Sequence, residues 1–206
     1  MEPRPIRVLG IGGSMREDSM SLVLLKCALN LAASAGAETS LADVRMLHLP
    51  MYNSDVPLDA HPMYVDETAT EEGEQPSSVH SFLAAVRAAD ALLICSPIYH
   101  GTISGAVKNA LDYLEFLSRD TPRYLGGRVV GLLGMGGAGA MNVLNAAYHT
   151  MRTINGLVVT TTAIVPKNAL DGDTLTITDT ALRDRVAAMT REVVDLALLT
   201  RSRWRA

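Results

Sequence analysis

The sequence predicts an α/β fold in which a parallel sheet is covered by helices on both faces. Two patterns alternate along the chain: short apolar runs, and longer segments whose apolar residues recur every three or four positions. Nearly continuous apolar runs are typical of strands buried on both faces, whereas the longer spacing indicates amphipathic helices. A length of 206 residues with 48% hydrophobic residues is sufficient for a full core, so we expect one domain over residues 1–206.

The N-terminal half contains three expected strands and two expected helices. The first helix is apolar on nearly all sides and is therefore expected to be buried. Residues 49–78 form a long irregular segment rich in proline and acidic residues, which we expect to be functional or mobile. In chain order the elements are strand 6–11, helix 18–35, strand 39–44, a helix marked by Val79, Phe82, Leu83 and Val86, and strand 91–95.

The C-terminal half continues this alternation. The last helix carries apolar residues from Leu182 to Leu196, and Asp179 is its expected N-cap. Five strands fit a doubly wound, flavodoxin-like sheet of order 2-1-3-4-5, which binds its ligand at the carboxyl ends of strands 1 and 3. The remaining elements are a helix striped by Ile103, Val107, Ala110, Leu111, Leu114 and Leu117, strand 128–133, helix 138–154 and strand 157–164.

Composition and charge argue against several classes of function. A net charge of −4 without a long basic run argues against nucleic acid or a membrane surface as the main partner. No apolar stretch reaches the ~20 residues that cross a bilayer, and the N-terminus lacks the apolar region of a signal peptide. Cys27 and Cys95 both lie in apolar runs, which favours inert, reduced core thiols. We therefore expect a cytoplasmic protein.

The loop after the first strand, residues 12–21, has the composition of a phosphate-binding turn. Its glycines and serines expose N–H groups and hydroxyls at the start of a helix, whose dipole favours anions. Arg16 can bind phosphate oxygens through a forked pair of hydrogen bonds. The loop is not a Walker A motif, since no Gly-Lys-Ser/Thr follows, and Met15 stands at the third glycine position of a dinucleotide fingerprint. The alternative is a turn that only caps the helix.

The loop after the third strand predicts a site for a flat ring. Pro97 stiffens the turn, Tyr99 offers an aromatic face or edge, and Gly101 allows the backbone to approach closely. The chain is then expected to pass directly into the next helix. His100 either bonds to the ligand or shapes the turn, and the other histidines lack metal-ligand spacing. Tyr52, after the second strand, either approaches the ring or is a plain loop aromatic.

The loop after the fourth strand is glycine-rich and matches G-x-G-x-x-G over residues 134–139. A Rossmann dinucleotide site would also need an acidic residue about 20 positions later for the ribose. That region contains no acid before Asp171, and three strand–helix units precede the loop. We therefore expect these glycines to let backbone N–H groups reach a flat ring between strands 3 and 4.

Two of these loops resemble motifs of one family, the NADPH-dependent FMN reductases. Gly13-Ser14-x-Arg16-x-x-Ser19 is similar to the G-S-x-R-x-x-S phosphate loop of that family. Ala89-Asp90-Ala91 is similar to its A-D-A/G lead-in to the third strand. The stretch that is similar to its P-x-Y-N/H-G/S-S/T…G-x-x-K-N…D signature reads Pro97-x-Tyr99-His100-Gly101-Thr102-x-x-Gly105-x-x-Lys108-Asn109-x-x-Asp112. The resemblance covers about residues 6–164, with both motifs in register at the two expected loops.

The resemblance implies a flavodoxin-like FMN-binding domain that forms a homodimer or homotetramer. It implies hydride transfer from NADPH or NADH to N5 of FMN and on to free flavin, a quinone, an azo compound or a metal oxyanion. No catalytic side chain is expected, because the flavin carries the chemistry. The implied FMN-binding residues are Ser14, Arg16, Ser19, Met20 and Ser21 at the phosphate, Pro97, Ile98, Tyr99, His100 and Gly101 along the ring, and Gly134, Met135, Gly136, Gly137 and Ala138 at its other edge.

Three questions stay open at the level of sequence. A flavodoxin-type electron carrier that does not oxidise NAD(P)H is the alternative function, although its usual T-x-T-G-x-T loop is absent and the net charge of −4 is only mildly acidic. The acidic segment at residues 59–78 looks longer than is usual in the family, and would narrow the substrate range if it folded over the site. Leu114, Phe116 and Leu117 indicate either a subunit interface or burial within one chain.

Overall fold

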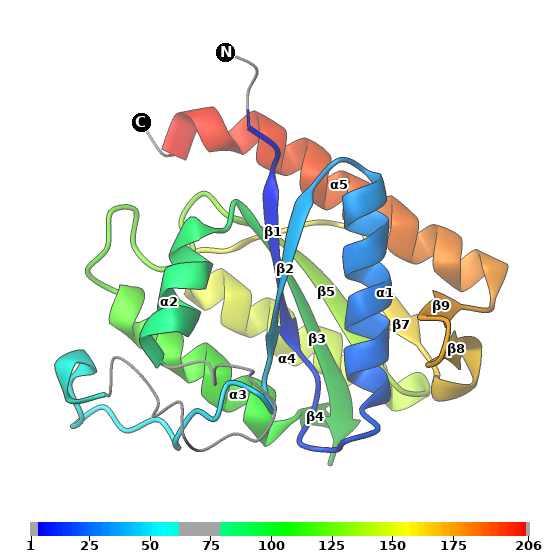
Figure 1. The fold of residues 1–206 in the computed structure, drawn as a ribbon, viewed down its shortest axis with the longest axis horizontal. Helices are drawn as coiled ribbons and strands as arrows, with labels where there is room; N and C mark the ends of the chain where they lie inside the picture. Colours follow the sequence, from blue (N-terminus) through cyan, green and yellow to red (C-terminus); the bar gives the residue numbers. More distant parts are fainter. Residues whose placement is uncertain (1–3, 62–78, 205–206) are drawn as a thin grey trace.

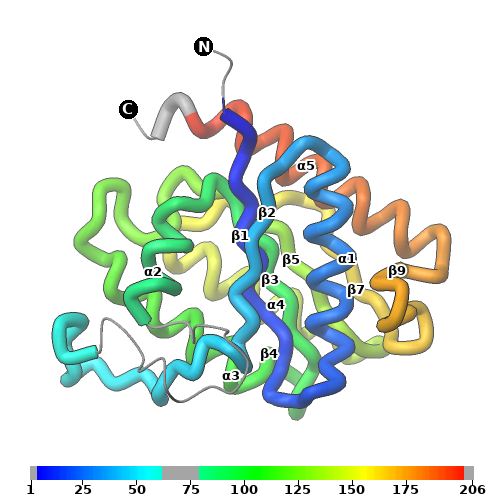
Figure 2. The backbone as a smooth tube through the Cα atoms, viewed as in Figure 1, coloured from blue at the N-terminus to red at the C-terminus, as the bar shows by residue number. Residues whose placement is uncertain are grey.

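The computed structural model describes residues 4–61 and 79–204 and contains the predicted central parallel sheet. Its order is β2-β1-β3-β5-β6, which corresponds to the predicted order 2-1-3-4-5. Figure 1 shows helices on both sides of this sheet, and Figure 2 follows the chain through the same view. The parallel strands are β1 (Arg7–Gly12), β2 (Glu38–Asp43), β3 (Ala91–Tyr99), β5 (Val129–Met135) and β6 (Leu157–Val158).

Two hydrophobic cores lie on opposite faces of the sheet, because successive strand residues point to opposite sides. Along β3, Leu92 and Ile94 belong to the first core, while Leu93 and Cys95 belong to the second. Burial on both faces explains why the strands read as continuous apolar runs. The helices are α2 (Val79–Ala88), α3 (Gly105–Asp112) and α4 (Met141–Thr153) over the first core, and α1 (Met20–Ser34) and α5 (Thr180–Trp204) over the second.

Side-chain caps set the starts of three helices. The Ser19 hydroxyl accepts a hydrogen bond from the first turn of α1, so this helix begins two residues after its predicted start. Ser104 caps α3 in the same way. Asp179 is confirmed as the cap of α5, because its carboxylate accepts from the backbone N–H of Leu182 at 2.9 Å. The chain leaves α1 through Gly36, whose φ of +90° suits glycine.

The prediction that the chain passes directly from the third strand into a helix is wrong. β3 continues to Tyr99, and a two-residue turn at His100 and Gly101 returns the chain antiparallel as β4 (Thr102–Ile103). Both turn residues have positive φ, 49° and 82°, which is the conformation of tight turns between antiparallel strands. The last part of the predicted helix is instead a 3-10 segment, η3 (Tyr113–Leu117).

The fifth predicted strand, residues 157–164, is also interrupted. It forms β6 and then β7 (Ala163–Val165), both parallel to β5. Between their paired positions β5 advances from residue 130 to 133 while the edge strand advances from 158 to 163, so the edge strand bulges by two residues. The Glu192 carboxylate of α5 accepts from the N–H groups of Thr160 and Thr161 and holds this bulge in place.

The remaining elements are short. A hairpin of β8 (Leu170–Asp171) and β9 (Thr176–Ile177) was not predicted, and three further 3-10 segments are η1 (Leu58–Ala60), η4 (Ala138–Ala140) and η5 (Lys167–Ala169). Of the acidic segment at residues 59–78, only residues 59–61 are described, so the question of whether it folds over the site and narrows the substrate range lies outside the described residues. Within the described ranges, no helix combines the length and apolarity that crossing a bilayer requires.

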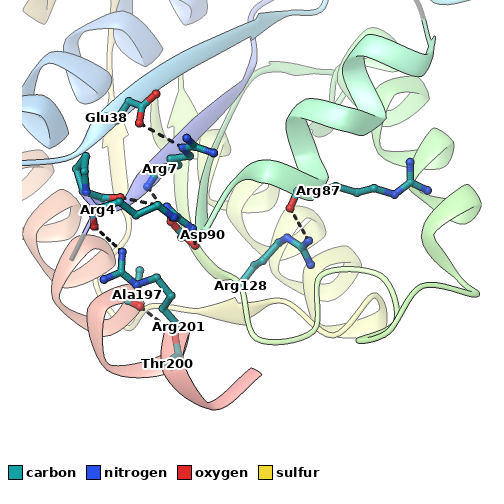
Figure 3. A network of polar contacts seen from close by, with 10 residues as sticks. Arg4, Arg7, Glu38, Arg87, Asp90, Arg128, Ala197, Thr200 and Arg201 are labelled. Atoms are coloured by element: carbon teal, nitrogen blue, oxygen red, sulfur yellow. Dashed lines mark hydrogen bonds and ion pairs between the residues drawn. The ribbon is translucent and has the colours of Figure 1, made fainter. Parts of the chain in front are cut away.

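A polar network occupies the amino-terminal end of the sheet (Figure 3). The Asp90 carboxylate, in a residue only 4% exposed, accepts two hydrogen bonds from the Arg4 guanidinium, at 2.7 and 3.0 Å, and one from the Arg7 N–H at 3.0 Å. The hydrogen bond to Asp90 raises the pKa of Arg4. Beside it, Arg128 donates to the Arg87 carbonyl at the end of α2. The Ala-Asp-Ala lead-in to β3 therefore has a structural role in this chain.

Replacing Asp90 by asparagine is expected to lower the free energy of unfolding by about 2 kcal/mol. The amide carries no charge, and its NH2 group would face the N–H donors of Arg4 and Arg7. Unfolding in urea measures this change. Glu38→Gln is the matched control, since the Arg7–Glu38 pair is 46% and 57% exposed and should contribute less than about 0.5 kcal/mol. Equal losses in the two variants would contradict the assignment.

Candidate functional site

A pocket of about 180 Å³ lies at the carboxyl ends of β1, β3 and β5, where the three predicted loops meet. We call it the carboxyl-end pocket. The structure brings together in it most of the residues that the sequence singled out. They are Ser14, Arg16, Ser19, Met20 and Ser21 from the first loop, Pro97, Ile98 and Tyr99 from the end of β3, and Met135 and Gly136 from the end of β5 and the residue that follows it.

Three serines of the first loop form a chain of buried hydroxyls. The hydroxyl of Ser14 donates to Ser19 at 2.9 Å, and the hydroxyls of Ser19 and Ser21 lie 3.1 Å apart. None of the three residues is more than 4% exposed. The three hydroxyls are thus hydrogen-bonded to one another at the N-terminus of α1, where the helix dipole favours an anion. This arrangement suits a phosphate group, and the same Ser19 also caps the helix.

Arg16 extends from this loop and is held by Asp18. Its Nε and one Nη donate to the two carboxylate oxygens, both at 3.0 Å. The hydrogen bonds from Arg16 hold the pKa of Asp18 below its ordinary value, and the charges of Arg16 and Lys167 lower it further. Both partners are mainly exposed, at 65% and 68% of their side-chain surface. A guanidinium fork of this kind is also the geometry that binds phosphate.

The end of β3 forms the second wall of the pocket. Its register pairs Pro97 with Met135 of β5, which places both residues at the same edge of the sheet. Tyr99 is 42% exposed at the mouth. His100 and Gly101 do not line the pocket and instead make the turn beyond it. His100 forms this turn, with a φ of 49°, and a hydrogen bond from His100 to a ligand stays a prediction.

The glycine-rich loop after β5 packs against the end of β3. A Cβ added to Gly136 or to Gly139 would lie 2.9 Å from the side chain of Ile98, so glycine permits this close approach. Gly134 lies within β5, Gly137 and Ala138 follow it in the loop, and none of the three lines the pocket. Close packing against Ile98 accounts for glycine at positions 136 and 139, and the approach of the loop's backbone N–H groups to a flat ring stays a prediction.

Sequence reasoning missed two charged residues that line the pocket, Asp18 and Lys167. Asp18 fell within both the predicted loop, residues 12–21, and the predicted helix, residues 18–35, and was given no role; it lies in the loop before the cap Ser19. Lys167 follows β7 and lies in η5. The edge strand was predicted as one strand that ends at residue 164, so the segment after β7 was not considered. The carboxyl ends of parallel strands share one edge, so the end of the fifth strand was also a candidate position.

Other singled-out residues lie in the folded interior. Tyr52 packs edge-to-face against Tyr113, with ring centroids 5.4 Å apart, and is a loop aromatic. Leu114 and Leu117 are fully buried in the first core and Phe116 packs against it, so burial within the chain accounts for all three.

The two cysteines are free and buried. Desolvation raises the pKa of Cys27 to about 11 and raises that of Cys95 as well, so both thiols stay protonated at neutral pH. In the part of the chain that the structure describes, no cluster of three or more His, Cys, Asp or Glu residues could hold a metal ion.

The geometry can now be compared with known proteins. A family model described as NADPH-dependent FMN reductase matches residues 6–170. The chain belongs to this family. The predictions of FMN as cofactor and of an NAD(P)H-dependent flavin oxidoreductase are thereby confirmed, and the electron-carrier alternative is not favoured.

Relatives named as flavin-linked reductases share the sequence. The chain is 33% identical over 149 residues to an NAD(P)H-dependent FMN reductase of Pseudomonas aeruginosa, covering 72% of this chain and 69% of that protein. It is 31% identical over 162 residues to an NADPH azoreductase of a Bacillus species, covering 76% and 74%. A probable NADPH:quinone oxidoreductase of Oryza sativa is 34% identical over 111 residues, covering 54% of this chain and 48% of that protein.

Solved structures agree on the fold. FerB, an NAD(P)H:acceptor oxidoreductase of Paracoccus denitrificans, matches with a TM-score of 0.69 at 20% identity, covering 95% of this chain and 98% of that chain. A WrbA-like flavodoxin of Agrobacterium tumefaciens matches with a TM-score of 0.60 at 13% identity, covering 96% and 99%. The flavodoxin-like fold predicted for this FMN reductase is therefore confirmed.

Proposed function

We propose that the carboxyl-end pocket of this FMN reductase binds FMN, with the phosphate at the first loop and the isoalloxazine ring between the end of β3 and the glycine loop. The observation that carries the proposal is the union, in one pocket, of a donor-rich end and an apolar end. Ser14, Ser19 and Arg16 form the first, and Pro97, Ile98 and Met135 form the second.

The donor-rich end fits a phosphate monoester. The hydroxyls of Ser14, Ser19 and Ser21, the N-terminus of α1 and the Arg16 guanidinium all belong to the first loop or the helix start that follows it, and these residues line the pocket. Each supplies a hydrogen-bond donor or positive potential to an anion. The buried hydroxyls are already oriented by one another, so little ordering is needed when the anion binds.

The apolar end fits the edge and one face of a flat ring. Pro97 and Met135 are held side by side by the sheet register, and Gly136 brings the loop close beside them. Bound FMN supplies hydride and electron transfer between NAD(P)H and an acceptor. The protein contributes orientation and backbone N–H groups, and a free flavin, a quinone, an azo compound or a metal oxyanion such as chromate is the proposed class of acceptor.

A homodimer or homotetramer is the proposed assembly, and the cytoplasm the proposed location. Met141 and Tyr148 of α4 are each 52% exposed, and they form an apolar surface that a second copy of the chain would cover. The two free, buried thiols are consistent with a reducing compartment.

An anaerobic titration of the FMN-loaded protein with NADPH, and separately with NADH, tests the function. We expect the visible absorbance of the bound oxidised flavin to be lost directly in a two-electron reduction. FMN without protein at the same concentration is the control. Absence of bleaching with either nucleotide, and one-electron reduction by dithionite, would contradict the proposal and support an electron carrier.

A further inference from the structure

An acidic side chain at the phosphate end of the pocket calls for an explanation. The charged residues that line the pocket, among the parts of the chain described, are Arg16, Asp18 and Lys167. A phosphate monoester carries close to two negative charges at neutral pH, so a carboxylate beside it opposes its binding. Asp18 is also not needed to cap α1, because Ser19 does so.

The geometry of the ion pair shows how Asp18 engages Arg16. Its two oxygens accept from the Nε and one Nη of Arg16, at 3.0 Å each. These donors form the fork that a phosphate group would use. Carboxylate and phosphate cannot occupy this fork at the same time.

We infer that Asp18 competes with the ligand phosphate for the Arg16 fork and pairs with Lys167 when displaced, so that these residues set how tightly a phosphate monoester is held. The inference rests on the proposed function of the pocket. Lys167 lines the same pocket from η5, and its charge already acts on Asp18. Its flexible stem gives its ammonium group a wide reach.

The neighbouring carboxylate offers a matched control. Glu17 precedes Asp18 by one residue and is 88% exposed, but it pairs with Arg45 and does not line the pocket. Glu17→Gln and Asp18→Asn therefore change the net charge of the same loop equally. Only Asp18→Asn frees the Arg16 fork.

The first experiment titrates the apoprotein with FMN and with riboflavin, which lacks the phosphate. Asp18→Asn is expected to lower the dissociation constant of FMN about threefold to tenfold, mainly through slower release, and to leave that of riboflavin unchanged. Glu17→Gln should change either constant less than about twofold. Weaker FMN binding by Asp18→Asn would overturn the inference and make Asp18 a support for Arg16. Unchanged FMN binding would overturn it unless the KM of NADPH falls in the same variant.

A double-mutant cycle tests the part played by Lys167. Lys167→Met is expected to weaken FMN binding about threefold in the wild-type background, since displaced Asp18 loses its second partner. In the Asp18→Asn background the same change should have no effect. An equal loss in both backgrounds would show that Lys167 binds the phosphate directly. It would refute the inference that displaced Asp18 pairs with Lys167.

The phosphate group could belong to FMN or to the 2′ position of NADPH, and steady-state kinetics of FMN-saturated enzyme separates the two. A gain in FMN affinity with an unchanged ratio of KM for NADPH and NADH supports competition with FMN. A lower KM for NADPH alone, with the KM of NADH and the FMN affinity unchanged, also supports competition and assigns it to the 2′-phosphate. If wild-type protein binds FMN no better than riboflavin, the proposed phosphate site fails; if it prefers FMN and neither gain is seen, only the inference fails.

Discussion

Replacing Gly12 by alanine is expected to destabilise the protein by about 3 kcal/mol or more, the largest loss that we predict for a single substitution. Gly12 is the last residue of β1 and pairs with Cys95 of β3. An added Cβ would overlap the Cys95 carbonyl oxygen, which is backbone and cannot rotate away. Relief requires the two central strands to separate at the edge that carries the pocket.

Thermal unfolding followed by circular dichroism measures this effect, and a loss of about 3 kcal/mol corresponds to a midpoint about 6–12 °C lower. Gly105→Ala is the control, because nothing lies within 4 Å of the Cβ that it would add at the start of α3. Alanine there should be neutral or stabilising by up to about 1 kcal/mol. A Gly12→Ala protein as stable as the wild type would refute the close approach of β1 and β3.

Replacing Arg16 by alanine is expected to weaken FMN binding by about tenfold to a hundredfold, because one charge-assisted fork is lost. Arg16 is mainly exposed and its guanidinium pairs with the exposed Asp18, so the substitution should leave the midpoint of unfolding nearly unchanged. Hydride transfer in the FMN-saturated variant should change much less, since the proposed ring site is formed by the ends of β3 and β5.

Fluorescence titration of apoprotein measures the FMN dissociation constant, and stopped-flow reduction by NADPH at saturating FMN measures hydride transfer. Riboflavin binding is the internal control and should respond little to Arg16→Ala. An FMN affinity equal to that of the wild type would contradict the placement of the phosphate at the first loop. A large loss for riboflavin as well would mean that the substitution disturbs the ring site.

The order of elements and the place of the pocket could be predicted from local patterns. Strand residues such as Leu92 and Leu93 face opposite cores, and this double burial leaves a continuous apolar run in the sequence. Caps such as Asp179 act within one turn of the chain, so they are also visible in the sequence. The two loop motifs then fall at the carboxyl ends of β1 and β3.

Departures from the predictions arise where distant segments meet. The two-residue bulge of the edge strand depends on Glu192, which lies 32 residues from Thr160. The tight turn at His100 and Gly101 depends on the pairing of β4 with β3. Leu114 was ambiguous because an apolar helix face does not reveal which surface covers it, and the first core of the same chain does so.

The sequence by itself determined the fold class, the family and the loops that form the pocket, because strand and helix periodicity and the glycine and serine turns are local properties of the chain. Only the tertiary structure decided that Asp18 occupies the Arg16 fork and that Lys167 lines the same pocket. Asp18 and Lys167 are 149 residues apart, and the parallel sheet brings them together by aligning the carboxyl ends of its strands.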